Sequence, residues 1–148
     1  MSAAPNWNGR IRALAWVGAV GLVGAQFVPA GRTNPPVGAR LVAPAEVEVV
    51  LRRSCFDCHS HETRWPWYSY VAPVSWWLVR HVDRGRGDLN FSQWPTLDAE
   101  ARTWILRDIE RQLMERKMPL RSYTRLHLSA SLNDADRDVL LRWVREQR

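Results

Sequence analysis

Cysteine is scarce in this 148-residue chain, which contains only two. Two cysteines cannot supply the two thiolate pairs of the usual structural zinc sites. The sequence also lacks a Gly-rich phosphate loop, a G-x-S-x-G elbow and an H-E-x-x-H motif, so hydrolase and nucleotide chemistry have no support. It shows no β-hairpin signal, internal repeat or low-complexity tract. We therefore expect one compact domain with an appendage, and no catalytic residues.

A dense run of basic residues is missing as well, although the formal net charge is +6. All 15 acidic residues follow residue 45, whereas the segment before it contains arginines and no acid. The N-terminal segment holds four arginines, and the remaining 17 basic residues face 15 acidic ones, so the rest of the chain is only +2. We expect no nucleic-acid partner.

An uncharged stretch, residues 13–30, follows Arg10 and Arg12. As a helix it would reach about 27 Å, slightly short of a bilayer core of about 30 Å. We predict that residues 1–28 form a single-pass anchor in the cytoplasmic membrane. The alternative is a cleaved signal peptide, because residues 23–25 are small. Both interpretations export the rest of the chain to the periplasm.

A linker rich in proline and glycine is expected over residues 29–44, and helical spacing of apolar residues dominates the domain predicted over residues 45–148. Thr96 and Asn133 are the expected N-caps of the two longest helices. The expected helices span residues 45–54, 73–83, 96–117 and 133–147, and Gly85 and Gly87 are expected to end the second of them. The predicted class is mainly α, a bundle of about four helices with long, aromatic-rich connections.

One pentapeptide carries the chemistry, because Cys55-Phe56-Asp57-Cys58-His59 matches C-x-x-C-H. In this motif two thiols add to the two vinyl groups of a haem, and the next residue supplies an imidazole to the iron. The spacing on a helical turn places both sulfurs along one porphyrin edge. We therefore expect one covalently attached c-type haem per chain, bound by Cys55, Cys58 and His59.

The two cysteines have three other interpretations: a redox dithiol, a zinc site and a disulfide. A thioredoxin-type dithiol needs a βαβ context, which the helical pattern does not provide. A zinc site would have to recruit His59, His61 or more distant groups. A disulfide would suit an exported domain but explains neither His59 nor the aromatic residues that follow. Zinc is the main alternative.

The sixth ligand of the iron has two candidates. Met118 follows the helix expected over residues 96–117 and precedes Pro119, which would hold a loop over the open haem face. His81, on the helix expected over residues 73–83, would give a bis-histidine centre. We favour Met118. If neither side chain binds, the sixth site is open.

Nine tryptophans are many for a chain of this length. We expect the aromatic residues that follow the motif to cover the haem and exclude water from it. These residues are Trp65, Trp67, Tyr68, Tyr70, Trp76, Trp77 and Trp94.

Residues 54–76, with the short matches Leu-Asn-Phe-Ser at 89–92 and Met-Pro-Leu at 118–120, resemble the bacterial haem-binding domain family, which is cytochrome c-like with a single C-x-x-C-H. The resemblance covers roughly residues 41–148. It implies a c-type haem on the two cysteines with His59 as a ligand, in a cytochrome c-like helical fold that faces the periplasm. It implies no particular partner.

These observations predict a carrier of single electrons rather than an enzyme. Its partners would be an unknown redox protein and, through the N-terminal segment, the membrane, with no small-molecule substrate. The alternative is a haem-based sensor or peroxidase-like enzyme with an open sixth site. A zinc-binding module is the weaker alternative.

Overall fold

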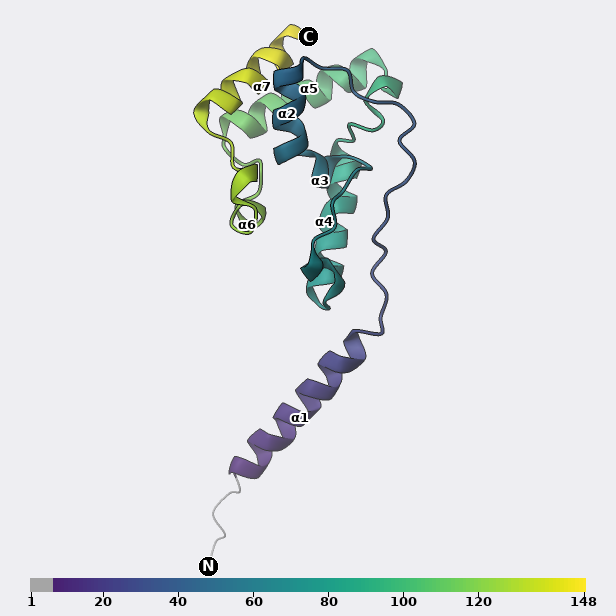
Figure 1. The fold of residues 1–148 in the computed structure, drawn as a ribbon, viewed down its shortest axis with the longest axis vertical. Helices are drawn as coiled ribbons and strands as arrows, with labels where there is room; N and C mark the ends of the chain where they lie inside the picture. The colour runs from purple at the N-terminus through teal and green to yellow at the C-terminus, as the bar shows by residue number, and fades with distance from the viewer. Residues whose placement is uncertain (1–6) are drawn as a thin grey trace, which may run out of the picture. The chain divides into compact units, whose positions relative to one another are not determined.

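The computed structural model describes residues 7–148, and every regular element in that range is helical (Figure 1). The mainly α class is therefore confirmed for these residues. Residues 1–6 of the predicted N-terminal segment lie outside the described range. The chain divides into two compact units, which we treat separately. One comprises Met1–Arg32 and Pro66–Val79, and the other Thr33–Trp65 and Arg80–Arg148.

The first unit contains helix α1 (Trp7–Ala25) and the short 3-10 helix η1 (Trp67–Tyr70). After α1, the Gln26 side-chain amide donates to the Ala72 carbonyl (3.2 Å) and accepts from the Ala72 backbone N–H (3.0 Å). Arg32 donates to the Ser69 carbonyl (2.8 Å). These bonds attach the chain after α1 to the residues around η1.

Helix α1 is shorter in its uncharged part than the sequence suggested. It begins at Trp7, so Arg10 and Arg12 lie inside it, and it ends at Ala25 instead of continuing to residue 30. The uncharged helical part, residues 13–25, is about 20 Å long against a bilayer core of about 30 Å. No helix of residues 7–148 has the length and apolar character needed to cross a membrane. The prediction of a hydrophobic anchor helix is not supported.

The core of the second unit lies among three helices, α2 (Ala45–Ser54), α5 (Ala99–Met114) and α7 (Asp134–Glu146), which pack together in Figure 1. Each presents apolar residues to the core at helical spacing. The most deeply buried include Val47, Leu106, Leu140, Trp143 and Val144. Burial of these side chains is what holds the three helices together.

Two of the expected helices have the predicted bounds, and two differ. Residues 45–54 form α2, and α7 begins after Asn133, which makes a capping box with Asp136. Helix α5 starts later than expected because residues before it form the 3-10 helix η2 (Trp94–Thr96), and Asp98 is its N-cap. Helix α4 (Val74–Asp88) continues through two glycines that we expected to end it.

The segment expected to be a linker is bound to the rest of the second unit from residue 33 onward. The Asn34 amide donates to the Thr63 carbonyl (2.8 Å), and Arg86 donates to the Thr33 carbonyl (2.9 Å). Further on, Leu41 packs against the core cluster. This stretch has no helix or strand, yet its contacts make it part of the unit.

Candidate functional site

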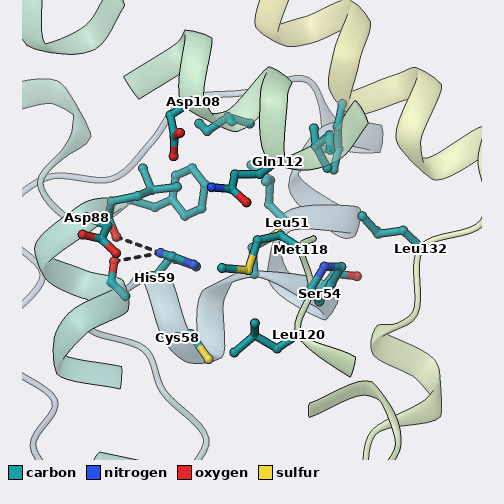
Figure 2. Close-up of a pocket in the computed structure, with 18 of the residues that line it drawn as sticks. Leu51, Ser54, Cys58, His59, Asp88, Asp108, Gln112, Met118, Leu120 and Leu132 are labelled. Atoms are coloured by element: carbon teal, nitrogen blue, oxygen red, sulfur yellow. Dashed lines mark hydrogen bonds between the residues drawn. The ribbon is translucent and has the colours of Figure 1, made fainter. Parts of the chain in front are cut away.

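A cavity of about 330 Å³ opens inside the second unit, between α2, α5, the C-terminal part of α4 and the chain that follows α5 (Figure 2). Most of its lining is apolar, and Leu51, Ile105, Ile109 and Leu132 are typical members. Such a lining favours a largely apolar ligand over a charged one.

The C-x-x-C-H motif lies at one side of the cavity. Helix α2 ends at Ser54, and the motif continues as the single turn α3 (Phe56–His59). The backbone N–H groups of Cys58 and His59 both donate to the Cys55 carbonyl, at 3.1 and 3.0 Å. This turn directs Cys55, Cys58 and His59 to the cavity, and all three line it. The structure therefore brings together the three residues predicted from the motif.

Phe56, between the two cysteines, points the other way and anchors the turn. It is buried, and its ring stacks on Phe91 with centroids 5.3 Å apart. The backbone N–H of Phe91 also donates to the His59 carbonyl (2.8 Å). Contacts with the buried Phe91 thus hold the motif in place.

The His59 ring is held by backbone carbonyls at the end of α4. Its Nδ1 lies 2.8 Å from the Gly85 carbonyl oxygen and 3.1 Å from that of Leu89. Because a carbonyl only accepts, Nδ1 carries the proton and Nε2 keeps its lone pair. Figure 2 shows the ring edge opposite these bonds facing into the cavity, toward Met118. Burial also lowers the pKa of His59, which favours the neutral imidazole that a metal requires.

Gly85 has a specific steric role here. A Cβ added to it would lie 2.7 Å from the Cys58 carbonyl oxygen, a distance that real Cβ atoms do not adopt. Glycine inside a helix costs about 1 kcal/mol relative to alanine. The absence of a side chain lets α4 approach the motif closely enough to bind His59. We expected Gly85 to end the helix, because only the tertiary contact with Cys58 reveals its role.

The two cysteines are free thiols in a poorly solvated site. Burial raises the pKa of Cys55 to about 12 and that of Cys58 to about 11, so both stay protonated at neutral pH. In residues 7–148 no three His, Cys, Asp or Glu side chains are grouped so that they could hold a metal ion. The described part of the chain thus gives the zinc alternative no geometric support.

Both candidates for the sixth ligand line the same cavity. Met118 is half-buried and follows α5, and the next two residues, Pro119 and Leu120, also line the cavity. His81 lies on α4, one turn before Gly85. His61 does not line it, because its ring contacts the Pro36 carbonyl (3.1 Å) and the Asn90 side chain (2.8 Å).

The prediction that the aromatic residues after the motif surround the site does not match the lining of the cavity. None of the seven residues between 65 and 94 lines the cavity; its aromatic lining comes instead from Phe91, Tyr123 and Trp143. Trp67 is largely exposed, whereas Trp94 is buried against Trp143 in the core. Proximity in sequence to the motif therefore did not indicate which aromatic rings surround the site.

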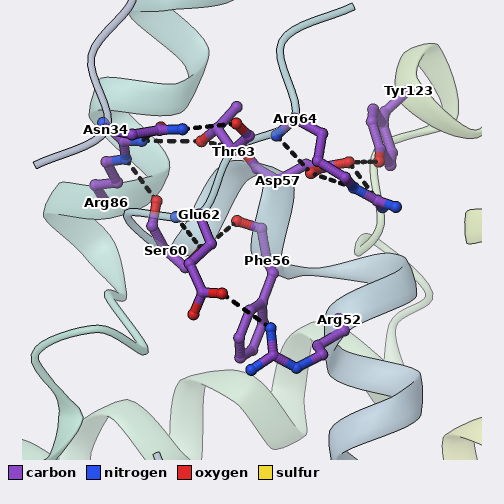
Figure 3. Close-up of polar contacts among 10 residues, drawn as sticks. All are labelled: Asn34, Arg52, Phe56, Asp57, Ser60, Glu62, Thr63, Arg64, Arg86 and Tyr123. Atoms are coloured by element: carbon purple, nitrogen blue, oxygen red, sulfur yellow. Dashed lines mark hydrogen bonds and ion pairs between the residues drawn. The ribbon is translucent and has the colours of Figure 1, made fainter. Parts of the chain in front are cut away.

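A polar network beside the cavity was not anticipated (Figure 3). The Tyr123 hydroxyl donates to Asp57 Oδ2 (2.7 Å), and Arg64 donates to Asp57 Oδ1 through its backbone N–H (3.0 Å) and Nε (3.3 Å). Burial and the Asp57 carboxylate raise the pKa of Tyr123, so it remains a phenol and a hydrogen-bond donor. No local sequence signal pairs residues 57 and 123.

Comparison with known proteins identifies the family of the chain. The family model of the haem-binding domain matches residues 20–146, a stretch that includes the motif, α4 and Met118. No curated protein and no solved structure matches the chain. Because the matched range covers most of the sequence, the chain belongs to the haem-binding domain family.

Proposed function

We propose that this protein carries one c-type haem, attached through Cys55 and Cys58 and ligated by His59 and Met118, and that it transfers single electrons. The observation that carries the proposal is that both thiols, the Nε2 edge of His59 and the Met118 side chain share one apolar cavity. When bound, the haem supplies an iron that cycles between the ferrous and ferric states. The protein's part is to hold and tune it.

The donor set of the cavity fits a covalently bound haem. Each thiol would add across one vinyl group, with the sulfur bonding to one carbon and the thiol hydrogen passing to the other, so no external oxidant is required. The imidazole already has its proton on Nδ1 and offers Nε2 to a metal. The apolar lining would exclude water from the ring. We infer a cytochrome c-like arrangement of helices around the cofactor.

The geometry favours Met118 over His81 as the sixth ligand. Helix α4, which bears His81, binds the Nδ1 edge of His59 through Gly85. Met118 approaches from the opposite edge, where Figure 2 shows its thioether. His59, through Nε2, and Met118, through its thioether, would therefore together hold the iron. A thioether there would raise the reduction potential compared with a second imidazole.

The spectrum of the purified holoprotein tests this ligation. We expect Met118→Ala to abolish the weak near-infrared charge-transfer band of thioether-ligated ferric haem, and His81→Ala to leave it intact. The wild-type ferrous protein should bind carbon monoxide slowly at neutral pH. Rapid binding by the wild type would contradict the electron-carrier proposal and favour a sensor or peroxidase-like enzyme with an open sixth site. Loss of the band only in His81→Ala would contradict the choice of Met118.

We also propose that the haem domain functions outside the cytoplasm. Support comes from the acid-free N-terminal segment, with Arg10 and Arg12 before uncharged residues and small residues at 23–25. Cell fractionation tests the location, and the N-terminal sequence of the mature protein tests whether the segment is cleaved. Holoprotein found only in the cytoplasm would contradict the proposal.

A further inference from the structure

The Met118 side chain belongs to a short segment whose far end is tied to the motif. Met118, Pro119 and Leu120 lead into the single turn α6 (Arg121–Thr124). The Leu120 carbonyl accepts from the backbone N–H groups of Tyr123 and Thr124, both at 3.0 Å. These bonds make residues 120–124 a compact turn, so a displacement of Tyr123 would also move the chain beside Met118.

The tie is the hydrogen bond from the Tyr123 hydroxyl to Asp57 Oδ2, at 2.7 Å (Figure 3). It joins residues 66 positions apart in sequence. Asp57 lies within the motif, between Cys55 and Cys58. This hydrogen bond between side chains therefore connects the turn that bears the two cysteines to the segment that bears the proposed sixth ligand.

Asp57 is itself held firmly. Its carboxylate is 13% exposed and accepts three hydrogen bonds from Arg64, while its backbone carbonyl accepts from the Thr63 hydroxyl (2.8 Å). On the other side, the Tyr123 ring stacks on His127 with centroids 4.3 Å apart. A short bond between a phenol and a shielded carboxylate is among the stronger neutral-to-charged hydrogen bonds. Neighbouring residues thus hold both Asp57 and Tyr123 in place without any bound ligand.

We propose that Tyr123 is a positioning residue that keeps Met118 at the sixth coordination site by anchoring residues 118–124 to Asp57. Without the hydroxyl, the segment loses its bond to the motif, and Met118 leaves the site more often. External ligands then compete for the iron. This inference rests on the proposed ligation by His59 and Met118.

The test is Tyr123→Phe in the full-length holoprotein, which removes one oxygen and keeps the ring. We expect imidazole to bind the ferric protein about tenfold more tightly or more, in line with the loss of a charge-assisted hydrogen bond. Carbon monoxide should bind the ferrous protein faster by a similar factor, and the near-infrared thioether band should weaken. Asp57→Asn keeps an acceptor without the charge and should give a smaller change in the same direction.

Tyr70→Phe is the matched control, because Tyr70 is 61% exposed and belongs to the other unit. It should leave imidazole affinity and the near-infrared band unchanged. Tyr123→Phe that behaves like Tyr70→Phe, while Met118→Ala opens the site, would overturn the role of Tyr123 and leave the proposed function intact. If Met118→Ala changes neither signal, the ligation itself is wrong and the inference falls with it.

Discussion

The two sides of the cavity are held by different kinds of contact. On the motif side, backbone atoms dominate, because His59 is bound by the Gly85 carbonyl and its own carbonyl accepts from Phe91. On the Met118 side, a hydrogen bond to the motif is made between two side chains, those of Tyr123 and Asp57. The Gly85 carbonyl and the Phe91 N–H are present whatever side chain stands at those positions, whereas a substitution of Tyr123 or Asp57 removes the contact on the Met118 side. We therefore expect substitutions to displace the Met118 side more easily than the motif side.

Removing the core anchor behind the motif should have the largest effect. Phe56→Ala deletes a buried ring that stacks on Phe91, and we expect the free energy of unfolding to fall by about 3 kcal/mol or more. Chemical denaturation measures this loss. Val49→Ala, on an exposed position of neighbouring α2, is the control and should change stability little. A tolerated Phe56→Ala would mean that the motif does not depend on the core.

Blocking the approach of α4 should be the next largest change. In Gly85→Ala the added methyl group would meet the Cys58 carbonyl at 2.7 Å, so the backbone of α4 or of the motif has to move. We expect a loss of about 1–3 kcal/mol of stability and a shifted haem reduction potential, since the His59 hydrogen bond weakens. Denaturation and redox titration of the holoprotein measure the two effects.

Gly87 provides the matched control for this substitution. It lies in the same helix, and a Cβ there would meet nothing within 4 Å. Gly87→Ala should therefore leave the potential unchanged and stabilise the fold by about 0.5–1 kcal/mol. Equal behaviour of the two alanine variants would show that the close contact at Gly85 is unimportant.

A substitution at the N-cap of α7 separates stability from ligation, because the Asn133 side chain is not among those that line the cavity. Asn133 caps α7, and its side chain accepts from the Asp136 backbone N–H (2.8 Å). We expect Asn133→Ala to lower the free energy of unfolding by about 1 kcal/mol while the absorption spectrum and imidazole affinity stay unchanged. A spectral change in this variant would mean that any loss of stability disturbs the site, and the comparison of the two sides would lose its force.

The smallest effect is expected at the exposed side of the Asp57 network. Arg64 is 73% exposed in its side chain, and an exposed ion pair contributes less than about 1 kcal/mol. Its backbone N–H would still bind Asp57 in Arg64→Gln. Imidazole affinity should therefore stay within about twofold of the wild type, since little stabilisation is lost. A change as large as that of Tyr123→Phe would identify Arg64 as the main support of Asp57.

Sequence reasoning succeeded where the signal is local. The bounds of α2, the cap of α7 at Asn133 and the grouping of Cys55, Cys58 and His59 on one turn follow from short-range spacing. It failed where contacts between distant parts of the chain determine the role of a residue. Gly85 does not end α4 but lets it meet Cys58.

The aromatic residues and the polar network illustrate the same limit. Rings that follow the motif in sequence do not line the cavity, whereas Trp143 reaches it from the last helix. The bond between Asp57 and Tyr123 depends on the placement of α6, which has no periodic signal of its own because it is a single turn. Contacts between distant segments need the fold before they can be recognised.

The most direct test of the account is the intact mass of the protein after maturation in the periplasm and full denaturation. Thioether bonds survive unfolding, so the wild type should carry the mass of one haem, and a variant with Cys55→Ala and Cys58→Ala should have the mass of the bare polypeptide. A wild-type chain that loses its haem on denaturation, or never holds one, would contradict covalent attachment at Cys55 and Cys58.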